Sequence, residues 1–193
     1  MIRILQDSLR GISGKTIVEF GAGYHEAFRL DIAKNNHYIV SDINLRELSI
    51  QPNSNLDIRC IDACNIKLDN ASIDVACSSM LIMHLNIERH FSEVKRILKK
   101  DGVYLFAATG LKHNQELKIL GVDPHLDVDT DTMLKYGARL VCEECYFDPF
   151  IDTQDQFFWQ DMFSLDIDPD RFPVHGLTKH YLLFELSPDK KYY

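Results

Sequence analysis

The sequence predicts an α/β fold built on a doubly wound, mostly parallel sheet. Short apolar runs alternate with helix-like segments, the first run ends in a glycine turn, and acidic residues follow the next two runs. Such alternation is typical of parallel strands that are covered by helices on both faces. Ligands of these sheets bind outside the carboxyl ends of the strands. We therefore expect one domain over residues 1–193, with its site at that edge.

The predicted strands are short apolar runs that are bounded by turn residues. Five of them alternate with helices, and two late strands complete a seven-stranded sheet whose last strand is antiparallel. The strands are predicted at Thr16–Phe20, His37–Asp42, Leu56–Cys60, Ile73–Ser79, 102–109, 139–147 and 180–186.

Helical periodicity predicts the segments between the strands. Apolar residues from Ile87 to Leu98 recur at helical spacing, so we expect a helix over 86–100 that ends at Asp101 and Gly102. Residues before Ser13 and after Pro188 are expected to fray. Shorter helices are predicted over 25–34 and 129–136.

Composition narrows the class of protein. The net charge of −8 argues against a nucleic-acid partner. The sequence has no apolar stretch of about 20 residues and no signal-peptide pattern, so we expect a soluble, cytoplasmic protein without a membrane partner. Cys142 and Cys145 form a C-x-x-C pair, but they lie in a predicted strand and no second pair exists. No metal site is therefore predicted.

The strongest local pattern is the turn that follows the first strand. Gly21 permits a tight turn, and Gly23 lets a ligand approach the backbone. Glu19 adds a carboxylate at the end of the strand. That carboxylate would repel a pyrophosphate but suits a ligand with a cationic amino group.

Acidic residues also follow the second and third strands. Asp42 ends the second strand, at about the distance from the glycines where an acidic residue meets ribose hydroxyls. Asp62 and Ala63 follow the third strand, where they would meet an adenine amino group. A dinucleotide fits less well, because the position that needs a third small residue holds Glu26. An NAD-dependent oxidoreductase is therefore the less favoured interpretation.

As a set, these motifs resemble the class I S-adenosylmethionine-dependent methyltransferases, and the chain looks like the type 11 group. The resemblance covers 16–109, and the stretches 68–85 and 93–106 are similar to the family's fourth-strand motif and to the signature that leads into its fifth strand. It implies a Rossmann-like fold, S-adenosylmethionine as the cofactor and methyl transfer as the reaction. The cofactor-binding residues that it implies are Glu19, Phe20, Gly21, Ala22, Gly23, Asp42, Ile43, Asp62, Ala63, Ser78 and Ser79.

The resemblance also implies a role for each part of this set. Glu19 would lie beside the methionine moiety, and Asp42 would bind the ribose. Asp62 and Ala63 would frame the adenine, and the two serines of the fourth strand would face the cofactor.

Two departures from the family pattern motivate an alternative function. His25 stands where the glycine motif usually has a third small residue, and the N-terminal segment that often closes the cofactor pocket is short. The alternative is a non-catalytic protein that keeps the fold and acts as a binding or regulatory partner.

Methyl transfer is an in-line displacement, so the protein must mainly orient the acceptor and shield the site. A general base is needed only for an acceptor that is protonated at neutral pH. His84 is the catalytic candidate, because it follows the fourth strand, where the family places acceptor-facing residues. We expect His113 and His125 on the surface.

The acceptor is expected to be a small molecule or a carrier-bound acyl group. The stretch 124–138 resembles a segment of the malonyl carrier-protein methyltransferases, whose partner is an acidic carrier protein. A basic cluster would dock such a carrier, although a solvated helix end is the favoured interpretation. The cluster comprises Lys95, Arg96, Lys99 and Lys100.

The connection 148–179 between the last two strands is too long for an ordinary loop. It would form a wall of the acceptor pocket, a contact in a homodimer, or an elaboration that packs on the domain. Its large apolar residues are Phe157, Phe158, Trp159, Met162 and Phe163.

Overall fold

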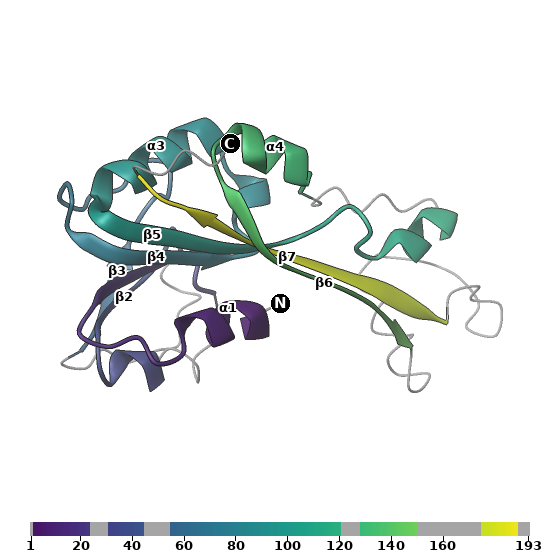
Figure 1. Ribbon diagram of the computed structural model, residues 1–193, viewed down its shortest axis with the longest axis horizontal. Coiled ribbons are helices and arrows are strands. Elements are labelled where there is room, and N and C mark those ends of the chain that lie inside the picture. The colour runs from purple at the N-terminus through teal and green to yellow at the C-terminus, as the bar shows by residue number, and fades with distance from the viewer. Residues whose placement is uncertain (1, 24–30, 45–54, 121–127, 150–174, 189–193) are drawn as a thin grey trace.

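The computed structural model describes residues 2–23, 31–44, 55–120, 128–149 and 175–188. The described strands form one sheet of seven in the order β3-β2-β1-β4-β5-β7-β6 (Figure 1). This order confirms the predicted α/β fold with a mostly parallel sheet and an antiparallel last strand. The strands are β1 Thr16–Phe20, β2 His37–Asp42, β3 Leu56–Cys60, β4 Ile73–Ser79, β5 Leu98–Thr109, β6 Arg139–Pro149 and β7 Gly176–Leu186.

Helices cover both faces of this sheet. α3 and α4 lie on one face and α1 lies on the other (Figure 1). None of the helices in the described part of the chain is long and apolar enough to cross a membrane. Their bounds are α1 Ile2–Leu9, α3 Ile87–Ile97 and α4 Thr130–Lys135, with 3₁₀ turns η2 Ile82–His84 and η3 Gln115–Leu120.

β1 lies at the centre of the parallel part of the sheet and pairs with β2 and β4. Because both of its faces are covered, its last four residues are buried. Val18 and Phe20 pack in the core under α3, whereas Ile17 packs in the core on the α1 side. The alternation of side chains along the strand thus divides β1 between two hydrophobic cores.

The helix over 86–100 is shorter than predicted. α3 ends at Ile97, and Leu98 adopts extended backbone and already pairs with Ile73 of β4. The expectation that Asp101 and Gly102 end the helix is therefore wrong. Periodicity misled here because Leu98 is buried in either conformation.

The expectation of fraying before Ser13 is also wrong. Residues 2–9 form α1, and its buried residues Ile4, Leu5 and Leu9 join the core on that side of the sheet. The apolar residues recur at helical spacing, so the short helix is stabilised by packing.

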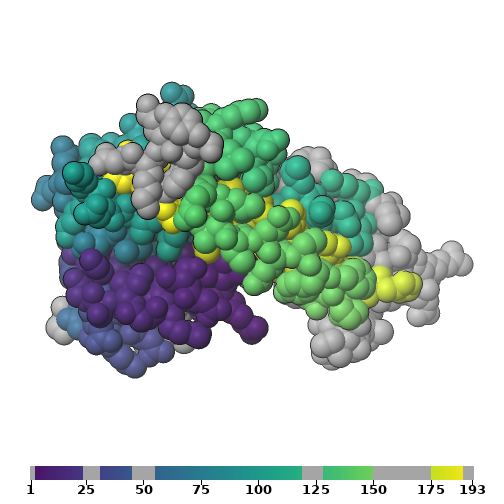
Figure 2. Space-filling model, viewed as in Figure 1, coloured from purple at the N-terminus to yellow at the C-terminus, as the bar shows by residue number. Residues whose placement is uncertain are grey.

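The last two strands are longer than predicted. The pair Thr109 and Tyr181 closes the ladder between β5 and β7, but β7 begins earlier, at Gly176, and β6 continues to Pro149. The two strands form an arm that continues past the end of β5, as β6 shows in green in Figure 2. The connection is therefore 150–175, of which 150–174, with its aromatic cluster, lies outside the described residues.

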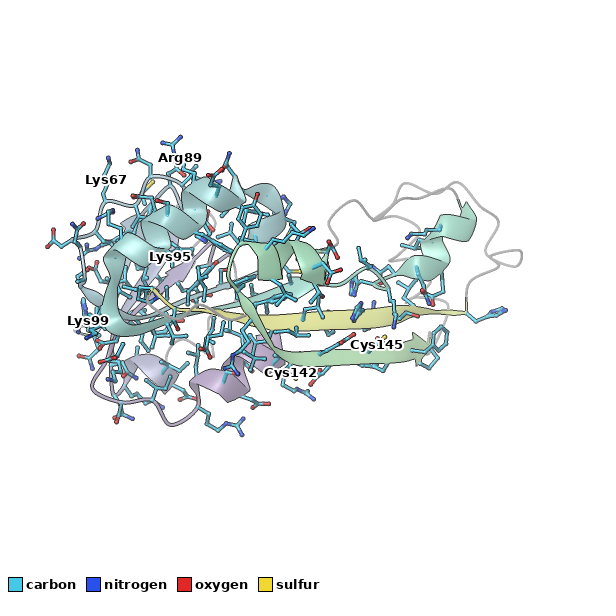
Figure 3. All side chains as sticks on the ribbon, turned by 45° about the horizontal axis from the view of Figure 1, so that its top comes forward. Lys67, Arg89, Lys95, Lys99, Cys142 and Cys145 are labelled. Atoms are coloured by element: carbon cyan, nitrogen blue, oxygen red, sulfur yellow. The ribbon has the colours of Figure 1, made fainter. Side chains whose placement is uncertain are left out.

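Cys142 and Cys145 lie apart along this arm (Figure 3). Cys142 is half-buried and pairs with Leu183, whereas Cys145 is exposed and pairs with His180. Both are free thiols.

Two of the four residues of the basic cluster, Arg96 and Lys99, are engaged within the chain. The Arg96 guanidinium donates to the Glu93 carboxylate at 2.9 Å and to two backbone carbonyls of the segment before β4. Lys99 donates to Asp74 at 2.8 Å. Lys95 and Lys99 lie at this end of the helix (Figure 3). These contacts argue against a docking patch, but only Lys95 and Arg96 lie in the last turn of α3, because Lys99 and Lys100 belong to β5.

Asn36 should be one of the polar residues on which the fold depends most. Its buried amide donates to the carbonyls of Ile12 and Ile32 at 2.9 and 2.8 Å and accepts from the Lys15 N–H at 3.0 Å. Asn36→Ala removes all three bonds, each worth about 1 kcal/mol, so we expect the free energy of unfolding in urea to fall by about 2 to 4 kcal/mol.

The matched control is Asn35→Ala, which truncates the exposed neighbour. This variant should unfold within about 0.5 kcal/mol of the wild type. Equal unfolding curves for the two variants would refute the role assigned to Asn36.

Candidate functional site

The turn after β1 is held by two backbone donors. Gly21 and Gly23 adopt left-handed backbone with φ of 62° and 51°. The N–H of Ala22 donates to the Ser41 carbonyl at 3.0 Å, and the N–H of Gly23 donates to the Asp42 carboxylate at 3.3 Å. The turn is thus fixed against the end of β2, and its glycines are required by the backbone itself.

The two glycines face different surroundings. A Cβ on Gly21 would lie 2.8 Å from the Leu81 side chain, which follows β4. A Cβ on Gly23 would meet no atom within 4 Å among the described residues. The close approach of a ligand to Gly23 stays a prediction.

Glu19 lies at the end of β1 and is 6% exposed. Its carboxylate accepts a hydrogen bond from the Tyr38 hydroxyl at 3.0 Å. Burial, followed by the charges of Cys77 and Glu19, raises the pKa of Tyr38, so the phenol stays protonated and donates. The carboxylate is therefore oriented on the α1 side of the sheet.

Asp42 and Asp62 organise the loops that follow β2 and β3. Asp42 accepts from the Asn44 N–H at 2.9 Å, and its carbonyl accepts from the Ile61 N–H at 3.2 Å. Asp62 accepts from the Cys64 N–H at 2.8 Å. Each carboxylate thus closes a turn two residues long, which is a usual role of Asp, and the two loops are joined.

Ser78 and Ser79 differ in burial. Ser78 is 1% exposed, and its hydroxyl lies 2.6 Å from that of Tyr104 in β5. Ser79 is half-buried at the last position of β4. Because neighbours in a strand face opposite sides, the two serines point to different faces of the sheet.

Three more predicted residues have simple surroundings. Phe20 is buried in the core under α3, so its contribution to the edge is its backbone. Ile43 is 71% exposed just after β2. Ala63 is 8% exposed, and its carbonyl lies 2.7 Å from His90 Nδ1.

His90 and Tyr104 are buried polar residues that the sequence analysis missed. A carbonyl can only accept, so His90 Nδ1 carries a proton and donates to Ala63. Burial lowers the pKa of His90, which favours the neutral ring and leaves Nε2 as an acceptor for the Tyr104 hydroxyl at 2.9 Å. Ser78 then donates to Tyr104. The chain of donors runs from β4 through β5 and α3 to the loop after β3.

The segment that is expected to face the acceptor begins directly after β4. Met80 adopts φ of 58°, which is uncommon for a residue with a side chain, and its N–H donates to the Ala107 carbonyl at 2.9 Å. His84 ends the short turn η2 and is exposed. It therefore lies beyond the carboxyl end of β4, on the sheet edge that also carries the glycine turn.

The expectation of a surface position for His113 is wrong. Its ring packs against Tyr181, and its Nδ1 accepts from the His180 N–H at 3.1 Å. Burial, followed by the charges of Lys179 and His180, lowers the pKa of His113 to about 4. His125 lies outside the described residues.

The edge of the sheet fits a nucleoside that carries a cationic group. The residues present are an open glycine backbone at Gly23, an oriented carboxylate at Glu19, and the carboxylates of Asp42 and Asp62 at the next two strand ends. An anionic edge of this kind disfavours a pyrophosphate and favours positive charge.

Comparisons with known proteins agree with this fit. The family of the methyltransferase domain matches residues 13–106, from the turn before β1 into β5. No curated protein matches the sequence. At 12% identity, the YcgJ protein of Bacillus subtilis has a TM-score of 0.67, with 98% of each chain covered.

Two further solved structures share the fold. An S-adenosylmethionine-dependent methyltransferase from Mesorhizobium loti has a TM-score of 0.58 at 17% identity, with 95% of each chain covered. The Haemonchus contortus phosphoethanolamine N-methyltransferase 2, in complex with S-adenosyl-L-methionine, has a TM-score of 0.62 at 14% identity. That match covers 97% of this chain and 52% of the other. At these identities the likeness concerns the fold alone.

The matched segment 13–106 contains the glycine turn, the acidic strand ends and the end of β4. The weaker resemblance of 124–138 to the malonyl carrier-protein enzymes stays a prediction. The sequence match and the sheet order lead to one conclusion: residues 13–106 match the methyltransferase domain, and the chain has the fold of S-adenosylmethionine-dependent methyltransferases.

Proposed function

We propose that this methyltransferase acts on a small molecule, with the cofactor held along the carboxyl ends of β1, β2 and β3. The observation that carries the proposal is the hydrogen bond from the Gly23 N–H to the Asp42 carboxylate at 3.3 Å. It brings the open glycine backbone and the acidic end of the neighbouring strand together. The net charge of −8 supports a small acceptor over a nucleic acid.

Bound S-adenosylmethionine supplies a methyl group that its sulfonium makes reactive. In our proposal, Glu19 attracts the cationic amino group, and Asp42 accepts hydrogen bonds from the ribose hydroxyls. Asp62 and the backbone at Ala63 lie where they would meet the adenine. The protein's part in the reaction is then to orient the acceptor and exclude water, which proximity alone makes effective.

The acceptor would lie beside the segment that follows β4. Met80, Leu81 and Met83 give this segment an apolar character, and His84 adds an exposed imidazole. If the acceptor is protonated at neutral pH, His84 would take up its proton. A carboxylate acceptor would need no base.

Asp42→Ala should weaken binding of S-adenosylmethionine at least about tenfold, because a hydrogen bond to a charged group contributes about 1.5 to 3 kcal/mol. Calorimetric titration with S-adenosylmethionine and S-adenosylhomocysteine measures the change. Asp31→Ala, which removes an exposed carboxylate paired with Lys34, is the control and should bind as the wild type does. Undiminished binding by the Asp42→Ala protein would refute the proposed cofactor site.

Gly21→Ala should weaken cofactor binding more than its loss of stability explains, because the new Cβ displaces Leu81. Gly14→Ala is a matched control: its φ of 68° imposes a similar backbone cost of about 1 to 2 kcal/mol, but a Cβ there meets nothing within 4 Å. Gly14→Ala should lose stability in urea and keep its affinity, whereas Gly21→Ala should lose both stability and affinity. Equal affinities would show that the turn does not shape the site.

His84→Gln should lower kcat at least about tenfold for a protonated acceptor and leave the Kd of S-adenosylmethionine unchanged. Formation of S-adenosylhomocysteine with phenols, amines, carboxylates and carrier-bound acyl groups identifies the acceptor first. His37→Gln alters an exposed histidine at the opposite end of the strands and serves as the control. Full activity of the His84→Gln protein on a phenol or amine would exclude His84 as the base.

A further inference from the structure

His90 lies beneath three segments of the cofactor edge. It is on the core face of α3 and fully buried. Its ring meets that of Phe20 edge-on with centroids 5.8 Å apart, and Phe20 directly precedes the glycine turn. Its Nδ1 bonds the Ala63 carbonyl after β3, and its Nε2 reaches Ser78 at the end of β4 through Tyr104.

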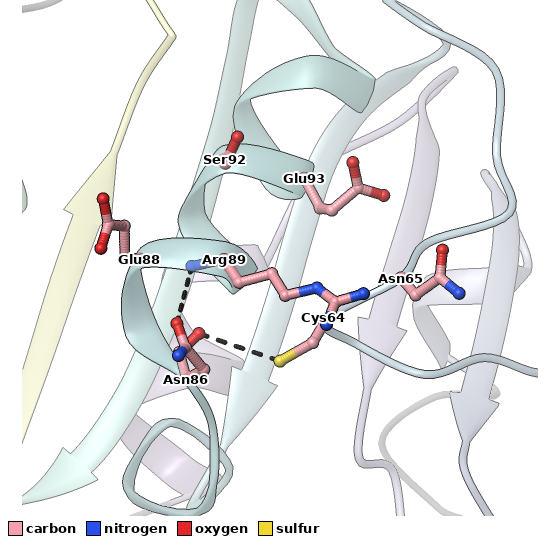
Figure 4. A pocket seen from close by; sticks show the side chains of 7 residues that line it. All are labelled: Cys64, Asn65, Asn86, Glu88, Arg89, Ser92 and Glu93. Carbon is pink, nitrogen blue, oxygen red and sulfur yellow. Dashed lines mark hydrogen bonds between the residues drawn. The ribbon is translucent and has the colours of Figure 1, made fainter.

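The loop after β3 depends on α3 for its position. Inside, the Ala63 carbonyl accepts from His90 at 2.7 Å. Outside, the exposed groove in Figure 4 shows the Cys64 thiol directed at the Asn86 carbonyl at 3.8 Å, and farther along the Ile66 N–H donates to Glu93 at 2.9 Å. A thiol is a weak donor and the groove is open to water, so the bond from His90 is the strong buried contact of the Asp62–Ala63 pair.

A role in core packing alone does not account for this histidine. A leucine or phenylalanine would fill the position among Phe20, Phe91 and Tyr104 without the cost of burying two polar nitrogens. Instead, position 90 holds an imidazole whose two nitrogens are both hydrogen-bonded. The two partners lie 27 and 14 positions away in the sequence. The arrangement fixes one tautomer, with the proton on Nδ1 directed at the loop.

We infer that His90 is a positioning residue, which holds the Asp62–Ala63 backbone in the place where it meets the adenine of the cofactor. This inference rests on the proposed function, because it assigns the loop after β3 to the adenine. His90 has no direct contact with the cofactor in this account. It acts through the Ala63 carbonyl.

Two substitutions distinguish this role from packing, because the amide of each new side chain replaces one nitrogen of the imidazole. His90→Asn places an amide N–H near the position of Nδ1, so the bond to Ala63 is retained. His90→Gln places its amide farther out, near Nε2, so the bond to Ala63 is lost. Each variant keeps a polar side chain, and the Kd of S-adenosylhomocysteine is measured by calorimetry at a temperature where circular dichroism shows both proteins folded.

The expected result is a Kd within about threefold of the wild type for His90→Asn and an increase of roughly tenfold for His90→Gln. Amide exchange of the unliganded proteins gives a second readout: the N–H groups of Cys64 and Asn65 should exchange faster in His90→Gln only. Cys64→Ala, which removes the outer contact of the same loop, should leave affinity unchanged.

Equal affinities for the two His90 variants would overturn the inference, whether both bind well or both bind poorly. If His90→Gln does not fold, Tyr104→Phe replaces it. That variant keeps the bond from His90 to Ala63 and should bind within about threefold of the wild type, so a tenfold loss would overturn the inference as well. A wild-type protein that binds neither S-adenosylmethionine nor S-adenosylhomocysteine would instead refute the proposed function.

Discussion

The arrangement of the site depends on the parallel pairing of β1 with both of its neighbours. The register aligns Phe20 with Ser41 of β2 and with Ser78 of β4, so three strands end at one level. β1 is buried up to its last residue, and the chain turns directly after it. Left-handed backbone at Gly21 and Gly23 makes that turn, and the end of β2 supplies the acceptors for its N–H groups.

This geometry gathers negative charge at the same edge. Glu19, Asp42 and Asp62 end three adjacent strands, and each carboxylate accepts a donor from the chain itself. Those donors orient the carboxylates and reduce the cost of placing them near one another, but they do not remove the charge. An edge of this kind discriminates between ligands by the sign of their charge. A sulfonium nucleoside with an amino group therefore suits it better than a dinucleotide with its anionic pyrophosphate.

The sequence predicted β1 to β4 to the residue, because each is a short apolar run that is stopped by a turn or an acidic residue. The prediction failed where a residue is buried in a helix and in a strand alike. Leu98 is buried whether it ends a helix or begins a strand, and the arm of β6 and β7 is a two-stranded ribbon whose length depends on pairing between residues far apart in the chain. His113 was misplaced for the same reason, since its cover comes from β7.

For His90, the helical spacing predicts burial but not the hydrogen-bond partners. Position 90 falls on the same face as Ile87, Phe91 and Val94, so the helical pattern alone places this histidine in the core. A buried imidazole needs two partners, and the sequence does not reveal that one of them is the carbonyl of Ala63. The polar residue within an apolar stripe was nevertheless a usable signal. Burial of its polar nitrogens costs free energy, and the hydrogen bonds that offset this cost join α3 to β5 and to the loop after β3.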